Sequence, residues 1–215
     1  MNPQPPESLE IQRVSGLCRI ALAVAQARSD RLDAALAVCA SAPEISDRDV
    51  EEAILQGIPY AGFPGAVEAL GAWRALAGAA SSEAESGPSI VSANATRRDQ
   101  GAALFHEVYG DVDARVLGEL RRRHEDLESW ILEFAYGRVL CRPHLPLPLR
   151  EALGVASLLA QGRRAPLHSH LRGALRCGLP QADLLALLDA LADWCDDEVI
   201  DFARERVRNE PRKPK

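Results

Sequence analysis

Apolar residues recur at helical spacing along nearly the whole chain. Leu17, Ile20, Ala21 and Val24, for example, fall on one face of a helix. No stretch shows the strict alternation of apolar and polar residues that is typical of strands. The pattern therefore predicts an all-α fold of roughly nine or ten helices.

Polar residues, glycines and prolines mark the ends of the predicted helices. Ser29 stands where an N-cap would begin a helix, and Ser46 with Asp49 resembles a capping box. The sequence Tyr-Ala-Gly-Phe-Pro-Gly at residues 60–65 breaks a helix, and Pro64 fits the first turn of the next one. Further helices are predicted at about residues 94–109, 126–139, 148–159, 166–177, 180–194 and 196–208.

Small and polar residues around Gly87 and Pro88 interrupt the helical pattern and indicate a domain boundary. Residues 50–55 align with 184–189, and Leu22 and Val24 match Leu153 and Val155, which suggests an internal repeat. The sequence thus predicts a disordered N-terminus at 1–12, a first, degenerate helical unit at 13–79, a linker at 80–93, a second helical unit at 94–209 and a disordered tail at 210–215.

Composition narrows the possible partners and the compartment. The 215 residues carry a formal net charge of −6, which argues against a nucleic-acid partner. No apolar run approaches the roughly 20 residues of a membrane span, and residues 1–10 do not resemble a signal peptide. The five cysteines are dispersed and include no Cys-x-x-Cys pair. We therefore expect reduced thiols and a cytoplasmic protein.

His170 and Glu151 are the strongest candidates for chemistry, because they lie on successive predicted helices. His170 shares a helix face with Leu167 and Leu171, which is the core side of that helix. One interpretation is a core histidine whose hydrogen bonds are satisfied by Glu151 or by a backbone carbonyl. The other is a proton shuttle oriented by Glu151 in a small pocket.

Arg142 and Arg150 flank the same region and are candidates for binding the carboxylate of a substrate. Solvated or structurally paired arginines are the alternative. No Glu-x-x-His pair, glycine-rich phosphate loop or Gly-x-Ser-x-Gly elbow is present. We therefore expect no metal and no cofactor.

Three segments resemble motifs of the carboxymuconolactone decarboxylase / alkylhydroperoxidase D-like family. Residues 149–153 (Leu-Arg-Glu-Ala-Leu) and 167–178 match the opening and the histidine segment, and residues 60–64 match the closing motif in the first unit. The first unit lacks the histidine, and the second has a degraded closing motif. The peroxidase branch of the family uses two cysteines, where this chain has Arg163 and Pro166.

The resemblance implies an all-α, alkylhydroperoxidase D-like helical bundle that assembles into ring-like trimers or hexamers. It implies acid/base chemistry without a cofactor on a small carboxylated or lactone substrate, as in a lyase. His170 would be the proton shuttle, Glu151 its orienting partner, and Arg142 or Arg150 the anion-binding group. A catalytically silent member that serves assembly or partner binding is the alternative. Peroxidase activity is disfavoured by the missing cysteine pair.

Overall fold

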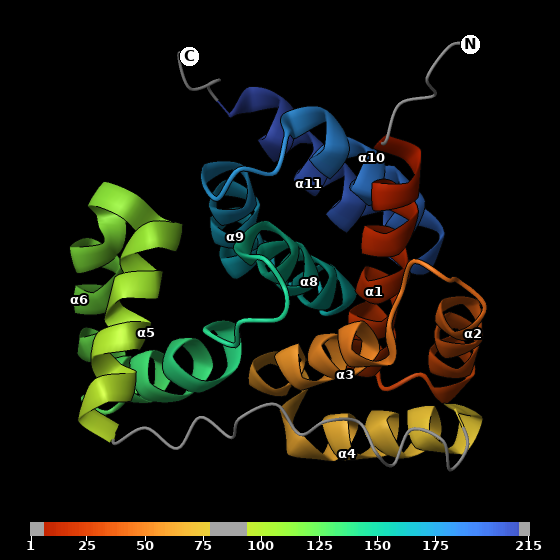
Figure 1. The fold of residues 1–215 in the computed structure, drawn as a ribbon. Coiled ribbons are helices and arrows are strands. Elements are labelled where there is room, and N and C mark those ends of the chain that lie inside the picture. Colours follow the sequence, from red (N-terminus) through yellow and green to blue (C-terminus); the bar gives the residue numbers. More distant parts are fainter. Residues whose placement is uncertain (1–6, 78–93, 211–215) are drawn as a thin grey trace, which may run out of the picture.

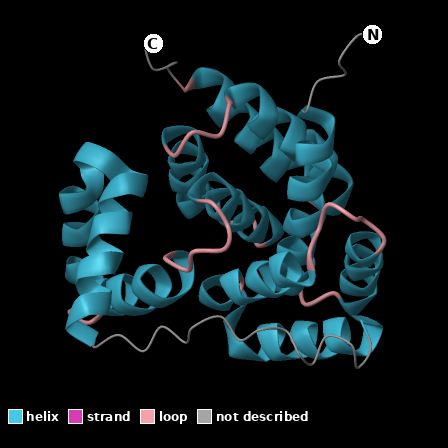
Figure 2. Cartoon of the chain, viewed as in Figure 1, coloured by secondary structure: helices cyan, strands magenta, loops and turns pink. Residues whose placement is uncertain are grey.

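The computed structural model describes residues 7–77 and 94–210, and every regular element in them is helical (Figures 1 and 2). The all-α prediction is confirmed. The first half contains α1 (Glu7–Gln26), α2 (Ser29–Ala40), α3 (Asp47–Gln56) and α4 (Ile58–Ala77). The second half contains α5 (Asn94–Tyr109), η2 (Gly110–Val112), α6 (Asp113–Arg123), α7 (Leu127–Trp130), η3 (Ile131–Leu140), α8 (Leu147–Ala160), α9 (Arg164–Arg176), α10 (Gln181–Leu191), η4 (Ala192–Trp194) and α11 (Asp197–Asn209).

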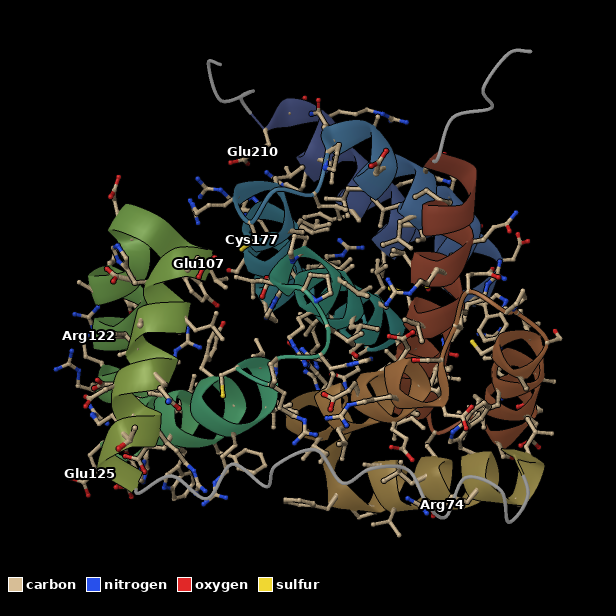
Figure 3. All side chains as sticks on the ribbon, in the orientation of Figure 1. Arg74, Glu107, Arg122, Glu125, Cys177 and Glu210 are labelled. Carbon is tan, nitrogen blue, oxygen red and sulfur yellow. The ribbon has the colours of Figure 1, made fainter. Side chains whose placement is uncertain are left out.

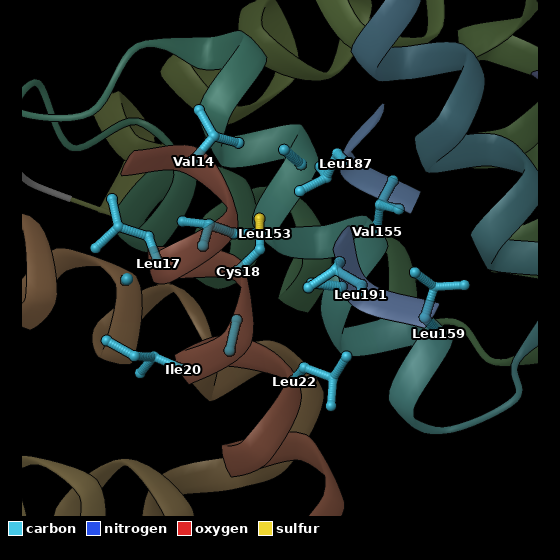
Figure 4. Close-up of a cluster of buried hydrophobic side chains, with 14 of the residues drawn as sticks. Val14, Leu17, Cys18, Ile20, Leu22, Leu153, Val155, Leu159, Leu187 and Leu191 are labelled. Carbon is cyan, nitrogen blue, oxygen red and sulfur yellow. The ribbon is translucent and has the colours of Figure 1, made fainter. Parts of the chain in front are cut away.

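One hydrophobic core joins the two halves of the chain. The central helices α1 and α8 pack against each other, and α2–α4 and α9–α11 surround them (Figure 1). Leu17 and Leu22 of α1 meet Leu153 and Val155 of α8 in this core, and none of the four side chains is exposed (Figure 4). Each such leucine contributes about 1.5–3 kcal/mol through burial. The predicted units at 13–79 and 94–209 therefore share a core, and their origin as repeats stays a prediction.

A smaller hydrophobic cluster lies between α5 and η3, and it includes Phe105 and Tyr136. The helix predicted around residues 126–139 is present, but η3 is wound as a π-helix. Glycines let α5 approach it closely. A Cβ atom on Gly101 would collide with the Leu132 carbonyl, and one on Gly137 with the Arg97 carbonyl. π-Helical turns are frequent at functional sites.

The predicted helix boundaries are largely confirmed. Ser46 and Asp49 form the expected capping box, and Gly62 has φ 78°, so it kinks α4 just before Pro64. The N-cap prediction for Ser29 is wrong. Arg28 is the cap residue, Ser29 is the first residue of α2, and no side chain caps this end.

The N-terminal end of the fold differs from the prediction. Helix α1 begins at Glu7, inside the segment that we expected to be disordered. The predicted linker at 80–93 and residues 211–215 of the predicted tail at 210–215 lie outside the described residues. Glu210 is described, and its carboxylate accepts a 2.7 Å hydrogen bond from Arg172. No helix within 7–77 and 94–210 is both long and apolar enough to cross a bilayer.

Candidate active site

The structure brings Glu151 and His170 into direct contact. Pro148 lies in the first turn of α8, which places Glu151 one turn into that helix, and His170 faces it from α9. Nδ1 of His170 lies 3.0 Å from Oε2 of Glu151. Glu151 is fully buried, and His170 is 8% exposed. With an ionised carboxylate as the acceptor, Nδ1–H of His170 is the donor of this hydrogen bond and Nε2 carries the free lone pair.

Two glycines provide the space for this pair. A Cβ atom on Gly173 would collide with the Glu151 carboxylate and lie 2.9 Å from Val108. A Cβ atom on Gly154 would lie 2.7 Å from the Tyr60 hydroxyl and 3.1 Å from Nδ1 of His170. Any residue larger than glycine at position 154 or 173 would therefore take up space that the carboxylate and the imidazole now occupy.

Tyr60 reaches this site from the first half of the chain. Its ring meets the His170 ring edge-on, with centroids 5.8 Å apart. Gln161 fixes the backbone by donating a 2.7 Å hydrogen bond to the Tyr60 carbonyl. Burial, with a smaller contribution from the charge of Glu151, raises the pKa of Tyr60 well above its usual value, so the phenol stays protonated. The sequence indicated only a helix break and a family motif at residues 60–65, so the contact of Tyr60 with His170 was missed.

The other two tyrosines of the chain, Tyr109 and Tyr136, belong to the smaller hydrophobic cluster between α5 and η3. The Phe105 ring contacts both, with centroid distances of 4.1 Å to Tyr109 and 4.9 Å to Tyr136. Burial raises the pKa of each phenol, and the charge of Glu151 acts in the same direction. A hydrogen bond between the two phenols lowers the pKa of Tyr109 and raises that of Tyr136, and burial keeps both groups protonated.

Arg142 and Arg150 are paired with Glu52 of α3 and are not brought to the Glu151–His170 pair. Nη2 of Arg142 lies 2.6 Å from Oε1 of Glu52, and Nη2 of Arg150 lies 3.1 Å from Oε2. Arg150 also donates to Gln56 and to the Arg142 carbonyl, at 2.9 Å and 2.7 Å. The structural pairing that the sequence left as an alternative is the one observed. The geometry does not support a substrate-binding role for either arginine.

Burial alone would raise the pKa of Glu52, but hydrogen bonds and charge from the two arginines outweigh it and hold the pKa below its usual value. No sequence motif marks this residue. Glu52 is therefore an ionised carboxylate that joins α3 to α8, outside the candidate site.

Burial raises the pKa of the thiols of Cys18, Cys39, Cys141 and Cys195. Arg163 and Pro166, at the positions of the peroxidase cysteines, are both exposed. Cys177 ends α9 and packs against the smaller cluster (Figure 3). Burial raises the pKa of Cys195 to about 11, which disfavours the thiolate. Within 7–77 and 94–210, no three His, Cys, Asp or Glu side chains converge as a metal site.

A helical bundle with a buried carboxylate–imidazole pair on adjacent helices defines a class of candidate acid/base proteins, and comparison with known proteins identifies the family. The family model described as "Carboxymuconolactone decarboxylase family" matches residues 125–208. The chain is 36% identical to 4-carboxymuconolactone decarboxylase from Acinetobacter baylyi over 93 residues, which cover 43% of this chain and 69% of that protein. The chain therefore belongs to the carboxymuconolactone decarboxylase family.

A second relative shares more of the chain at lower identity. Peroxisomal protein 2 from Schizosaccharomyces pombe is 27% identical over 147 residues, and the match covers 64% of each protein, so less than two thirds of that relative is represented. The family match at 125–208 includes Glu151, Tyr136 and His170 but neither Tyr60 nor Tyr109. The site thus combines residues from inside and outside the matched segment.

Proposed function

We propose that the protein is an acid/base enzyme of the lyase type that acts without a cofactor on a small carboxylated or lactone compound. The buried 3.0 Å contact between Nδ1 of His170 and Oε2 of Glu151 is the observation that carries this proposal. The membership of the family and the relative named 4-carboxymuconolactone decarboxylase support the substrate class.

His170 is the proton shuttle in this proposal, and Glu151 is its orienting partner. The carboxylate holds the proton on Nδ1 and stabilises the imidazolium that forms when Nε2 accepts a second proton. In a decarboxylation, the bond to the carboxylate carbon breaks and CO2 leaves. The electron pair moves into an adjacent carbonyl system. His170 enters this step as the imidazolium, having taken a proton from solvent at Nε2, and Nε2–H then delivers that proton to the carbon. Positioned proton transfer of this kind contributes about 10²–10⁴-fold in rate.

The test is CO2 release from 4-carboxymuconolactone by the full chain, together with proton–deuterium exchange at carbons next to the carbonyl of simple unsaturated lactones. We expect His170→Gln to reduce either rate by about 10²–10⁴-fold. His168→Gln is the matched control, because this imidazole lies on the same helix beside Arg172 and Arg206, outside the site. A wild-type rate equal to that of His170→Gln would favour the catalytically silent alternative.

We also propose that the chain self-associates, as the family resemblance implies. An apolar surface formed by Phe63, Val67, Trp130 and Phe134 supports this. Phe63 contacts Phe134 with ring centroids 5.8 Å apart, and Val67 is 67% exposed one turn further along α4. We expect Val67→Glu to shift the sedimentation coefficient to a smaller species. Val38→Glu, at an exposed valine on α2, is the control. A monomeric wild type would contradict the proposal.

The cytoplasmic location stays a prediction from the sequence. Since one relative is named Peroxisomal protein 2, a tagged full-length chain should be located by microscopy before a compartment is assigned.

A further inference from the structure

An open cavity of about 430 Å³ lies where α1 ends, α2 begins and α8 meets the turn between η4 and α11. Gln26, Arg31 and Asp196 contribute polar groups to its lining, and Leu159 and Val199 contribute apolar ones. Neither member of the carboxylate–imidazole pair lines this cavity. It is therefore separate from the candidate active site.

Arg31 is held in one orientation at this cavity by groups that carry no charge. Its Nη1 donates to Oε1 of Gln26 at 2.8 Å and to the Trp194 carbonyl at 2.6 Å. Gln26 is fixed in turn, because its Nε2 donates to the same carbonyl at 2.8 Å. The guanidinium carbon of Arg31 also lies 5.5 Å from the centroid of the Trp194 ring, which is a cation–π contact. The guanidinium group is thus positioned before any ligand arrives, which lowers the entropic cost of binding.

The anchoring of Nη1 leaves the opposite edge of this guanidinium unused. Arg31 makes no ion pair in the described part of the chain, and its Nε and Nη2 bond to no residue there. Both nitrogens are open to solvent, because the buried nitrogens without a partner in residues 7–77 and 94–210 belong to Arg19 and Trp73. The N–H groups of Nε and Nη2 are parallel, and this edge of an arginine binds the two oxygens of a carboxylate or a phosphate.

The acidic groups beside the cavity are already engaged with other partners. Asp30 accepts two hydrogen bonds from Arg28, at 2.8 Å and 2.7 Å. Asp196 is the N-cap residue of α11, and its Oδ1 accepts from the backbone N–H of Glu198 at 2.9 Å. Neither carboxylate therefore occupies the free edge of the guanidinium.

A second guanidinium group adds positive charge next to the cavity. The guanidinium carbon of Arg19 lies 5.8 Å from the centroid of the same Trp194 ring. Arg19 donates to the Ala190 carbonyl at 3.0 Å and makes no ion pair with a described residue. Two positive charges thus lie around Trp194, whereas Asp196 supplies one negative charge to the cavity. The local excess of positive charge favours an anion.

We propose that this cavity binds a small organic anion, whose carboxylate or phosphate accepts hydrogen bonds from Nε–H and Nη2–H of Arg31. The apolar part of the ligand lies against Leu159 and Val199, which form the apolar lining. A neutral compound of the same shape lacks the charge that this guanidinium recognises. The site is independent of the proposed reaction, because His170 takes no part in it.

The experiment is isothermal titration calorimetry of the full chain with benzoate and with phenyl phosphate. The two ligands share an apolar ring and distinguish a carboxylate from a phosphate. We expect at least one of them to bind, and benzamide, which has the same ring without the charge, to bind at least about 10-fold more weakly than that anion. Added NaCl should weaken the binding of the anion, since chloride screens and competes for the guanidinium.

Variants then assign the binding to Arg31. Arg31→Gln should weaken binding of the anion by about 10- to 100-fold, as expected for the loss of hydrogen bonds to a charged group. Arg115→Gln, at an exposed arginine of α6, is the matched control and should bind like wild type. Arg31→Gln also removes the hydrogen bonds of Nη1, so its melting temperature is measured in parallel. If this variant does not fold, the Nε–H resonance of Arg31 in the wild-type chain should move when the anion is added.

The proposal is overturned if wild type binds neither anion, if Arg31→Gln binds as tightly as wild type, or if the Arg31 resonance does not respond. It is also overturned if His170→Gln abolishes binding of the anion while Arg31→Gln retains it, because the anion would then occupy the candidate active site. The proposed function fails on a different observation, unchanged CO2 release and deuterium exchange in His170→Gln.

Discussion

Gly173 offers the sharpest test of the site geometry, because a single methyl group placed there must move Glu151. The glycine lies inside α9, where alanine is otherwise favoured by about 1 kcal/mol. The added Cβ atom would overlap the Glu151 carboxylate and press on Val108 at 2.9 Å. Neither neighbour has free space, since Glu151 is fully buried and Val108 is 1% exposed.

The expected change in the free energy of unfolding follows from two opposing effects. Forcing an extra methyl group into a packed interior costs about 1–3 kcal/mol, and the better helix propensity returns about 1 kcal/mol. We expect Gly173→Ala to lower the free energy of unfolding by up to about 2 kcal/mol. Displacement of the carboxylate from Nδ1 of His170 should also reduce proton transfer, by about 10²-fold for a misplacement of this kind.

Gly118 provides the matched control, since it lies inside α6 and a Cβ atom there would meet nothing within 4 Å. Gly118→Ala should gain up to about 1 kcal/mol from helix propensity alone. Urea unfolding monitored by circular dichroism measures the free energy of unfolding of both variants, and the m-values are compared as a check. If Gly173→Ala were stabilised as much as Gly118→Ala and kept its deuterium exchange rate, the close contact between α9 and Glu151 would be refuted.

Two further predictions concern the fold outside the site. Glu52→Gln leaves the buried guanidinium of Arg150 without its carboxylate and should cost about 3–5 kcal/mol in urea unfolding at neutral pH. Because the folded-state pKa of Glu52 is lowered, its contribution is present above its unfolded pKa of about 4.3 and is lost as the pH falls through the folded value. The difference between wild type and Glu52→Gln should therefore shrink in acid, and a constant difference would contradict this. Ser46→Ala removes the capping box of α3 and should cost about 1 kcal/mol in thermal unfolding, whereas Ser29→Ala, which removes no capping bond, should cost nothing measurable.

Local chemistry explains why the helices could be predicted from the sequence. Ser46 caps α3, Gly62 interrupts α4 and Pro148 begins α8 through contacts within a few residues, so the sequence carries each signal at the place where it acts. The N-cap at Ser29 was the exception, because Arg28 took the extended conformation before α2. The π-winding of η3 was not predictable, since it depends on how closely α5 packs against it through Gly101 and Gly137.

For a related reason, only part of the candidate site could be predicted from the sequence. Glu151 and His170 stand on adjacent helices of one segment, so the family motif and helical spacing were enough to pair them. The partner of the arginines, Glu52, is 90 residues from Arg142, and no periodic pattern links such positions. Tyr60 likewise meets the His170 ring only through tertiary packing. The sequence therefore could not predict which residues, far apart in the chain, come into contact in the fold.

The burial of α8 bears on whether the site is functional. From Leu149 to Leu159 every residue of this helix is buried, including Glu151, because α1 and α3 cover the sides that α9 leaves open. A carboxylate in that setting is expensive unless it is fully paired, and apolar replacements of buried ionic groups are often neutral or stabilising. One oxygen of Glu151 is unpaired, so the residue does not maximise stability. The proposed acid/base chemistry at His170 would give this buried carboxylate a function that packing alone does not, and the unpaired oxygen therefore favours the enzyme over the catalytically silent alternative.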